Sequence, residues 1–417
     1  MEIRDGSPRT PPPPYAAGAW WRAGLAVAAV GWGAQQFAPL LLLYQARLHL
    51  SATVIQATFG LYVFGLIPGM LLGGPVSDRY GRRRVMAPTL VASVAATALL
   101  LAGGAGVGWL FAGRLLAGVA SGAAFSSGAA WIKELSAGGT GGTGGGHGPR
   151  RLTVAMSVGF GLGPLVAGVL AQWAPEPTVL PYLPHLVLTA VAFPLVLRTP
   201  ETRTGRTGGS LLGRLRIPAL RGRRFRRVVV PLAPWVFGSA SVALAYLPGV
   251  VRSRLGGHAL IFSAVVTLLT AFSGILVQPL ARRADHPVRP RLHTTSLAIV
   301  VAGMLVAALA AATVRPALVI VAAVVLGAGY GCCQVCGLIE VQRLAGPHDL
   351  AGLTAAYQAV SYTGFVASVP LAAAGRAVPA GVLLLAVAGL AAGTLVWTAL
   401  QTREPAEVAS RVPEPAG

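Results

Sequence analysis

The sequence predicts an all-α integral membrane protein with twelve transmembrane helices arranged as two pseudo-symmetric six-helix bundles. Apolar residues make up 54% of the 417 residues and charged residues only 11%, whereas soluble proteins carry about 25% charged residues. Successive apolar runs have about the 20 residues that a helix needs to cross a bilayer. Two markers also recur with nearly the same separation, Pro75 with Pro279 and Glu134 with Glu340. Such a repeat indicates a duplicated six-helix unit.

Short polar stretches between the apolar runs set the expected boundaries. A tail covers residues 1–22, a first bundle 23–197, an arginine-rich central loop 198–227, a second bundle 228–400 and a second tail 401–417. The expected spans are 23–44, 53–75, 85–104, 107–131, 153–173, 178–197, 228–251, 258–280, 293–312, 316–338, 352–374 and 379–400.

The basic residues indicate the orientation of the chain. Lys and Arg outnumber Asp and Glu by 33 to 12, which gives a formal net charge of +21. These cations lie in the turns between apolar runs, mostly in alternate turns, and not in a soluble basic domain. That pattern predicts a multi-pass protein of the cell membrane with both termini in the cytoplasm. We therefore expect lipid as a partner and no nucleic acid; the Arg-, Ala-, Gly- and Pro-rich composition is typical of a GC-rich bacterial genome.

Three other segments have simple interpretations. The arginine-rich stretch 214–227 could lie as an amphipathic helix on anionic headgroups or serve as a plain topological anchor. The glycine-rich loop 136–149 lacks the Gly-Lys-Ser/Thr ending of a phosphate-binding loop, so we interpret it as a linker. Cys332, Cys333 and Cys336 lie within one apolar run and are expected to pack, not to bind metal. We expect no metal and no cofactor, with the proton as the coupling ion.

The turn between the second and third spans reads Gly-Pro-Val-Ser-Asp-Arg-Tyr-Gly-Arg-Arg-Arg. Gly74 and Gly81 allow close packing and a sharp turn, and Arg79 and Arg82 mark the cytoplasmic side. The pattern resembles the signature loop G-x-x-x-D-R-x-G-R-R of the major facilitator superfamily. The resemblance implies a transporter fold in which Asp78 caps neighbouring helix ends.

Arg114 stands about five residues into the fourth span, about 8 Å below the outer surface. An arginine at that depth is costly and usually faces a watery cavity; the alternative is an arginine that snorkels to the interface. The run from Arg114 through Gly118 to Gly122 resembles the superfamily's span-four motif, which implies a role in proton coupling.

The fifth span carries Gly159, Gly163, Pro164 and Gly168. This spacing is similar to the antiporter motif G-x-x-x-G-P-x-x-G-G of the superfamily's drug exporters, with Ala167 in place of one glycine. The small residues predict a close helix contact, and the proline predicts a bend. Glycine spacing alone is also consistent with ordinary packing, but the Gly-Pro pair favours export over import.

Glu134 ends the fourth span and Glu340 ends the tenth. By the same resemblance, Glu134 is expected to pair with Arg82 as part of a cytoplasmic gate, and Glu340 to pair with Arg282 or Arg283. Proton carriage is the alternative role for each glutamate.

None of the acidic residues lies at a predicted membrane centre. The first span offers Gln35 and Gln36, whose amides hydrogen-bond but do not take up protons near neutral pH. His185 in the sixth span could serve as a proton relay; a satisfied interfacial histidine is the interpretation that we favour.

Polar and aromatic side chains in apolar spans tend to face the transport cavity. On this ground the expected substrate-cavity residues are Gln35, Gln36, Tyr62, Trp131, Tyr246, Tyr330, Gln334, Tyr357 and Tyr362.

These patterns together predict an exporter of a small amphipathic or hydrophobic compound that works by alternating access and proton antiport. It resembles the drug:proton antiporters and is expected to function as a monomer. The alternatives are uptake of a sugar or organic anion on the same fold, and a membrane sensor or scaffold that transports nothing. An enzyme is not expected, because the sequence offers no nucleophile–base set, metal cluster or nucleotide loop.

Overall fold

The computed structural model describes residues 18–137, 147–203, 218–285, 291–346 and 350–403. Helices form all the regular structure in these ranges, and ten of the helical segments are long and apolar enough to cross a bilayer. The first and the eleventh spans are each interrupted and are therefore not among these ten; with them the fold has the twelve spans that the sequence predicted. The central residues 204–217 and both predicted tails, except for 18–22 and 401–403, lie outside the described residues.

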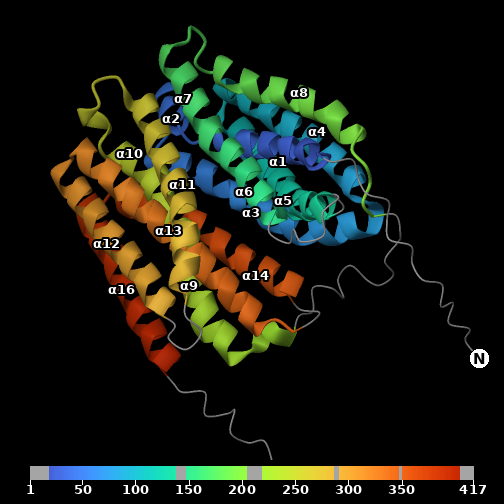
Figure 1. The fold of residues 1–417 in the computed structure, drawn as a ribbon. Helices are drawn as coiled ribbons and strands as arrows, with labels where there is room; N and C mark the ends of the chain where they lie inside the picture. The colour runs from blue at the N-terminus through green and yellow to red at the C-terminus, as the bar shows by residue number, and fades with distance from the viewer. Residues whose placement is uncertain (1–17, 138–146, 204–217, 286–290, 347–349, 404–417) are drawn as a thin grey trace, which may run out of the picture.

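Six spans form the first half of the molecule (Figure 1). The first span is broken into α1 (Trp20–Gln35) and α2 (Leu41–Arg47). The next three are α3 (Ala52–Tyr80), α4 (Arg82–Leu101) and α5 (Val107–Ala137). The fifth comprises α6 (His147–Ser157), a π-helical turn (Val158–Leu162) and α7 (Gly163–Trp173), and the sixth is α8 (Leu183–Leu197).

The second half repeats this order. Its first span runs from a π-helical turn (Phe225–Val229) through α9 (Val230–Ser241) and a second π-helical turn (Val242–Tyr246) to α10 (Leu247–Val250). It continues with α11 (Ala259–Ala284), α12 (Arg291–Thr313) and α13 (Pro316–Leu344). The last two spans are α14 (Leu350–Thr363) with α15 (Ser368–Ala374), and α16 (Ala380–Arg403).

Prolines explain where the spans are irregular. A proline ring meets the carbonyl four residues before it and cannot donate to that carbonyl. Helix α1 ends at Gln35, four residues before Pro39, and the 3₁₀ turn between α14 and α15 contains Val366, four residues before Pro370. The π-helical turn in the fifth span likewise lies just before Pro164, where the sequence predicted a bend.

Packing within the two halves follows one plan. Helices α3 and α5 cross in the first half as α11 and α13 do in the second, and α4 packs on α8 as α12 packs on α16. At the first crossing Gly118 lies against the backbone of Tyr62, and at the second Gly331 lies against the backbone of Gly274, so a Cβ atom at either glycine would overlap backbone atoms. Gly122 lies equally close to the backbone of α3, and Gly74 faces Ser126 of α5.

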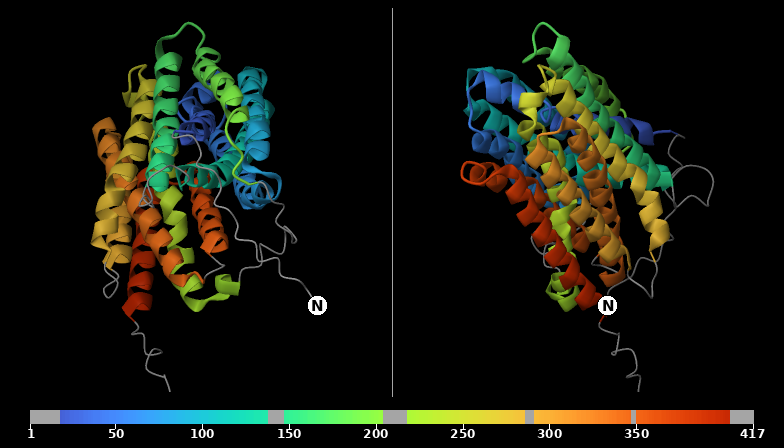
Figure 2. Two further views of the ribbon diagram at one scale, coloured as in Figure 1. Left: turned by 45° about the vertical axis from the view of Figure 1, so that its right-hand side comes forward. Right: turned by 90° about the vertical axis from the view of Figure 1, so that its left-hand side faces the viewer.

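The two halves meet near one end of the molecule. The opposite end, which contains the turn at Gly81, is called the arginine-rich end. Helix α7 packs on α11, and α3 packs on α15. Gln56 Nε2 donates to the Ala245 carbonyl at 2.7 Å, and Gln172 Nε2 donates to the Gly257 carbonyl at 3.0 Å. From these contacts the two sets of helices diverge toward the arginine-rich end, as the views in Figures 1 and 2 show.

Candidate functional site

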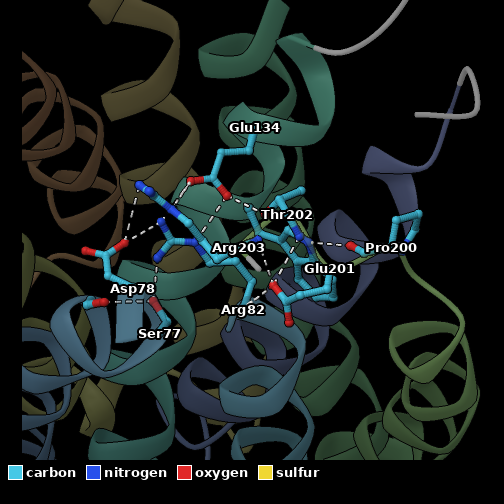
Figure 3. Close-up of polar contacts among 10 residues, drawn as sticks. Ser77, Asp78, Arg82, Glu134, Pro200, Glu201, Thr202 and Arg203 are labelled. Atoms are coloured by element: carbon cyan, nitrogen blue, oxygen red, sulfur yellow. Dashed lines mark hydrogen bonds and ion pairs between the residues drawn. The ribbon is translucent and has the colours of Figure 1, made fainter. Parts of the chain in front are cut away.

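A charge cluster forms around the turn between α3 and α4 (Figure 3). Arg82 is only 3% exposed, and its guanidinium donates to both Glu134 oxygens, at 3.2 Å from Nε and 2.8 Å from Nη2. Asp78 lies 2.6 Å from Arg82 Nη2. The cluster therefore contains the expected pair between Arg82 and Glu134, with a second acid on the same guanidinium.

Glu201, which the sequence analysis did not single out, caps α4. Its carboxylate accepts the backbone N–H groups of Arg82 at 2.7 Å and Arg83 at 3.0 Å, which are unpaired donors at a helix start. Gly81 has φ 105°, and a Cβ there would lie 2.5 Å from Glu201 Oε2. The prediction that Asp78 serves as a cap needs correction, because Asp78 lies within α3 and its carboxylate contacts the Arg82 side chain instead.

The start of the central segment completes this first cluster. Thr202 Oγ1 donates to Glu134 Oε2 at 2.5 Å, and Arg203 Nε lies 3.4 Å from Glu134 Oε1. Arg79 stays outside the cluster, exposed, with its guanidinium 5.6 Å from the Tyr80 ring. Trp131 also belongs to this end of the molecule, because its indole donates to the Pro200 carbonyl at 3.1 Å. That position does not support the prediction that Trp131 faces substrate.

A second cluster forms around Glu340, the repeat mate of Glu134. Glu340 is 1% exposed, accepts from Arg224 Nε at 2.5 Å, and lies 3.7 Å from His293 Nε2. Arg343 lies 3.8 Å from the same carboxylate and also pairs with Asp285. The predicted partners of Glu340 were therefore wrong: Arg282 and Arg283 are exposed at the end of α11, and the central segment supplies the cation instead.

Both described ends of the central segment are thus fixed to a glutamate cluster. Residues 201–203 dock on the first half, and Arg224 docks on the second. Residues 204–217, which connect these two ends, lie outside the described residues.

Arg114 is a buried cation of α5 in the first half of the molecule. It is 1% exposed, and its Nη1 donates to the Ala34 carbonyl at 2.7 Å. The guanidinium carbon lies 4.5 Å from the centre of the Tyr62 ring, 5.3 Å from that of Phe37 and 5.7 Å from that of Phe59. Its Nε has no hydrogen-bond partner, and no carboxylate of the described residues pairs with it. Cation–π contacts thus replace an ion pair, and the snorkelling alternative does not fit this burial.

Six aromatic side chains connect the two halves beside Arg114. The Phe59 and Tyr62 rings of α3 lie 5.4 and 6.4 Å from the Phe365 ring of the second half, centre to centre. Phe237 stacks on Phe365 at 4.9 Å and on Tyr362 at 4.1 Å. We call this group the aromatic bridge; its members are Phe59, Tyr62, Phe237, Tyr330, Tyr362 and Phe365.

The sequence analysis named three of the six, Tyr62, Tyr330 and Tyr362. It missed the phenylalanines because only polar or amphipathic aromatic side chains were taken as signals. The phenylalanines carry no polar atom that distinguishes them from packing residues. Only their contact across the two halves identifies them.

The remaining predicted cavity residues lie elsewhere or are already engaged. Tyr357 donates to the Cys333 carbonyl at 3.0 Å, and Gln334 Nε2 donates to Gln358 Oε1 at 3.2 Å. Tyr246 lies close to Gly375, near the end where the halves meet, and Gln35 is buried within α1. These positions leave Tyr62, Tyr330 and Tyr362 as the predicted residues that the structure brings together.

His185 belongs to a hydrogen-bonded chain within the first half. Its Nδ1 lies 2.9 Å from Thr97 Oγ1, and its Nε2 lies 3.1 Å from Ser93 Oγ and 3.2 Å from Thr189 Oγ1. Gln36 Nε2 donates to the same Thr97 hydroxyl at 3.2 Å. All the described partners are neutral, which fits the satisfied histidine that we favoured better than a relay to an acid.

The fifth-span motif lies between the first span and the second half. Gly159 approaches the Ala28 carbonyl, and Gly163 lies against Trp32, so the glycines let this span pack closely on α1. Pro164 is the second residue of α7, which follows the π-helical turn directly. Gly168 faces Ala264 of α11, where a side chain would separate the two halves. The motif therefore contributes to the contact between the halves as well as to packing within one.

Comparisons with known proteins agree with this architecture. The model of the Major Facilitator Superfamily matches residues 23–369. Solved structures with the same fold include a peptide transporter (TM-score 0.74, 14% identity, covering 92% of this chain and 94% of that one) and the nucleoside transporter NupG (0.72, 12%, 92% and 100%). Another is a human organic anion transporter (0.63, 17%, 93% and 100%). No curated protein sequence matches the chain. Since the family model covers most of its length, this chain belongs to the major facilitator superfamily.

Proposed function

We propose that the protein exports a small amphipathic or hydrophobic compound by alternating access, coupled to inward proton flow. The observation that carries this proposal is the aromatic bridge, which is contributed by both halves and lies beside the buried Arg114. Aromatic faces bind apolar and amphipathic molecules without demanding one hydrogen-bond pattern. A site shared by two pseudo-symmetric halves suits a transporter that opens to each side in turn.

The direction of opening follows from the charge distribution. The arginine-rich end should face the cytoplasm. The halves are in contact at the opposite end, through Gln56 with Ala245 and Gln172 with Gly257. On this orientation the structure corresponds to the inward-facing conformation, in which an exporter loads its substrate.

Antiport is supported by the fifth-span motif, which resembles that of drug exporters and packs Gly168 against α11. Coupling requires that proton and substrate favour different conformations of the two halves. The test is transport of a fluorescent amphipathic aromatic dye into inside-out vesicles, with an imposed pH gradient. We expect accumulation that collapses when an ionophore dissipates the gradient. Dye movement that is unaffected by the gradient would exclude proton antiport and indicate facilitated diffusion.

Arg114→Gln provides the variant for this assay, with Arg47→Gln as its matched control because Arg47 is exposed at the end of α2. The Arg114 variant should lose at least tenfold in transport at equal protein per vesicle, which is the loss expected when one charge-assisted contact worth about 1.5–3 kcal/mol is removed. Equal transport by both variants would remove Arg114 from the mechanism, and a protein that is only a scaffold would behave this way.

Transport of an organic anion is the second candidate, and Arg114 favours it. A buried guanidinium without a carboxylate partner in the described residues leaves room for an anionic group of a substrate. The two candidate functions differ in the charge of the substrate. An organic anion should compete with dye transport by the wild type and should not bind the Arg114→Gln variant, whereas competition only by neutral or cationic aromatics would exclude it.

A further inference from the structure

A groove of about 520 Å³ lies on the surface of the first half, where α3, α4 and α5 come together. Helices α3 and α4 both pack mainly on α5 and touch each other little. Helix α5 therefore forms the floor of the groove, through Val119, Ala120 and Ala123, and the other two helices form its walls. The two alanines of the floor, together with Ala92 on the α4 wall, leave a hollow that longer side chains would fill.

The groove belongs to the first half alone. All the described residues that line it come from α3, α4 and α5, and the helices on which α4 and α5 pack most are also in the first half. Val119 on the floor and Tyr80 on the α3 wall are each nearly half exposed, as expected for side chains that face lipid. The groove therefore lies outside the interface between the halves, where we proposed the transport site.

Arg84 lines the mouth of the groove, at the arginine-rich end. The two arginines before it in the chain are engaged within the protein, because Arg82 pairs with Glu134 and Arg83 Nη1 donates to the Leu197 carbonyl at 3.1 Å. Arg84 is exposed and makes no hydrogen bond or ion pair with any of the described residues. Its guanidinium is thus available to a ligand that enters the groove.

The groove becomes apolar beyond this mouth. From Arg84 the α4 wall continues through Pro88 to Ala92, which lies about 12 Å further along the helix. The Thr89 hydroxyl on this wall already donates to the Val85 carbonyl at 2.8 Å. A cationic mouth that leads into an apolar furrow matches a molecule with an anionic head and a hydrocarbon tail.

We propose that this groove binds an anionic phospholipid, with its phosphate on Arg84 and one acyl chain along the α5 floor. A guanidinium matches phosphate oxygens in geometry and charge. Tyrosine concentrates where hydrocarbon meets headgroups, so Tyr80 places the mouth of the groove at headgroup level. On the orientation proposed above, this is the cytoplasmic leaflet, whose anionic lipids bind basic pockets between membrane-spanning helices. The proposal is independent of what the protein transports.

The test uses the full-length protein in nanodiscs of phosphatidylcholine containing a small fraction of phosphatidylglycerol. Native mass spectrometry counts the phosphatidylglycerol molecules that stay bound after release from the disc. Arg84→Gln removes the cation of the mouth, and Arg283→Gln is its matched control, because Arg283 is exposed at the same end of the molecule but outside the groove. Ala92→Leu fills the apolar part of the groove, and Ala112→Leu makes the same change at an exposed position of α5 outside it.

We expect the wild type and both controls to retain one phosphatidylglycerol molecule. Arg84→Gln should bind it about fivefold more weakly, which is the contribution of one arginine near an anionic surface. Ala92→Leu should also weaken binding, because its longer side chain occupies the space of the acyl chain. An unchanged melting temperature and elution volume for each variant show that a loss of lipid is not unfolding.

Three results would overturn the proposal. Equal losses in Arg84→Gln and Arg283→Gln would reduce the effect to surface charge. A loss in Arg84→Gln with none in Ala92→Leu would place the lipid outside the groove. Displacement of the lipid by millimolar inorganic phosphate would identify the ligand as a soluble anion.

Discussion

At the scale of single residues, the two repeat-mate glutamates differ in how much they depend on one partner. Glu134 is 26% exposed and shares three partners, of which Arg82 binds both of its oxygens. Glu340 is 1% exposed, and one of its oxygens has no hydrogen-bond partner. A buried carboxylate that loses its cation is costly, whereas an exposed ion pair contributes little.

Replacing either of two arginines of the central segment, Arg203 and Arg224, should therefore destabilise the protein to a different extent. Arg224→Gln should lower the free energy of unfolding by about 2–3 kcal/mol, because it leaves Glu340 buried with weaker partners. Arg203→Gln should lower it by less than about 1 kcal/mol, because Arg82 still binds Glu134. Thermal unfolding of both variants in one detergent measures the difference. Equal destabilisation would contradict the assignment of Arg224 as the main partner of Glu340.

The sequence indicated the pair of Arg82 with Glu134 but not the pair of Arg224 with Glu340. The sequence analysis paired Arg82 with Glu134 through a family motif, because the motif implies that these two positions lie close together in the fold. Arg224 and Glu340 are 116 residues apart, and no periodicity joins a loop arginine to the end of a distant helix. Glu201 was missed for a similar reason, because its capping partners start a helix far from it in the chain.

At the scale of helices, the close crossing of α3 and α5 depends on glycine. Gly118 lies so near the Tyr62 backbone that a methyl group must move one of the two helices, whereas a methyl group at Gly108 of the same helix would meet nothing within 4 Å. The same substitution at these two glycines thus separates packing from helix propensity.

Gly118→Ala should destabilise the protein by about 1–3 kcal/mol through overpacking, and Gly108→Ala should be neutral or slightly stabilising because alanine favours helix. Unfolding of both variants in mixed micelles with increasing sodium dodecyl sulfate provides the comparison. A Gly118→Ala protein as stable as the Gly108→Ala protein would show that the two helices can separate without cost.

Hydropathy predicted the helical spans well because lipid requires each span to satisfy its own backbone. Their interruptions were harder to foresee. Prolines 39, 164 and 370 each follow an irregular stretch, while Pro68 and Pro75 sit inside the continuous helix α3. Proline alone therefore does not decide where a span breaks; the packing around it, which the sequence does not display, also contributes.

At the scale of the whole molecule, the two halves share one packing plan and are in contact at one end, which is the arrangement that the proposed alternating access requires. The duplication was visible in the sequence through Pro75 with Pro279 and Glu134 with Glu340. Which ends are in contact was not, because charge patterns set orientation and do not distinguish one conformation from another.

Alternating access predicts that the two ends of the molecule move in opposite senses. Spin labels at residues 79 and 283 report the separation of the halves at the arginine-rich end, and labels at 176 and 258 report it at the opposite end. All four positions are exposed, and the native cysteines Cys332, Cys333 and Cys336 are buried. The labelled proteins must retain transport to be informative.

The most direct measurement is the distance distribution of each label pair by pulsed electron paramagnetic resonance, with and without substrate and at two pH values. We expect a population in which the 79–283 distance shortens while the 176–258 distance lengthens. Distances that stay fixed under every condition, or that change in the same sense at both ends, would contradict a transporter whose two halves rock around the aromatic bridge.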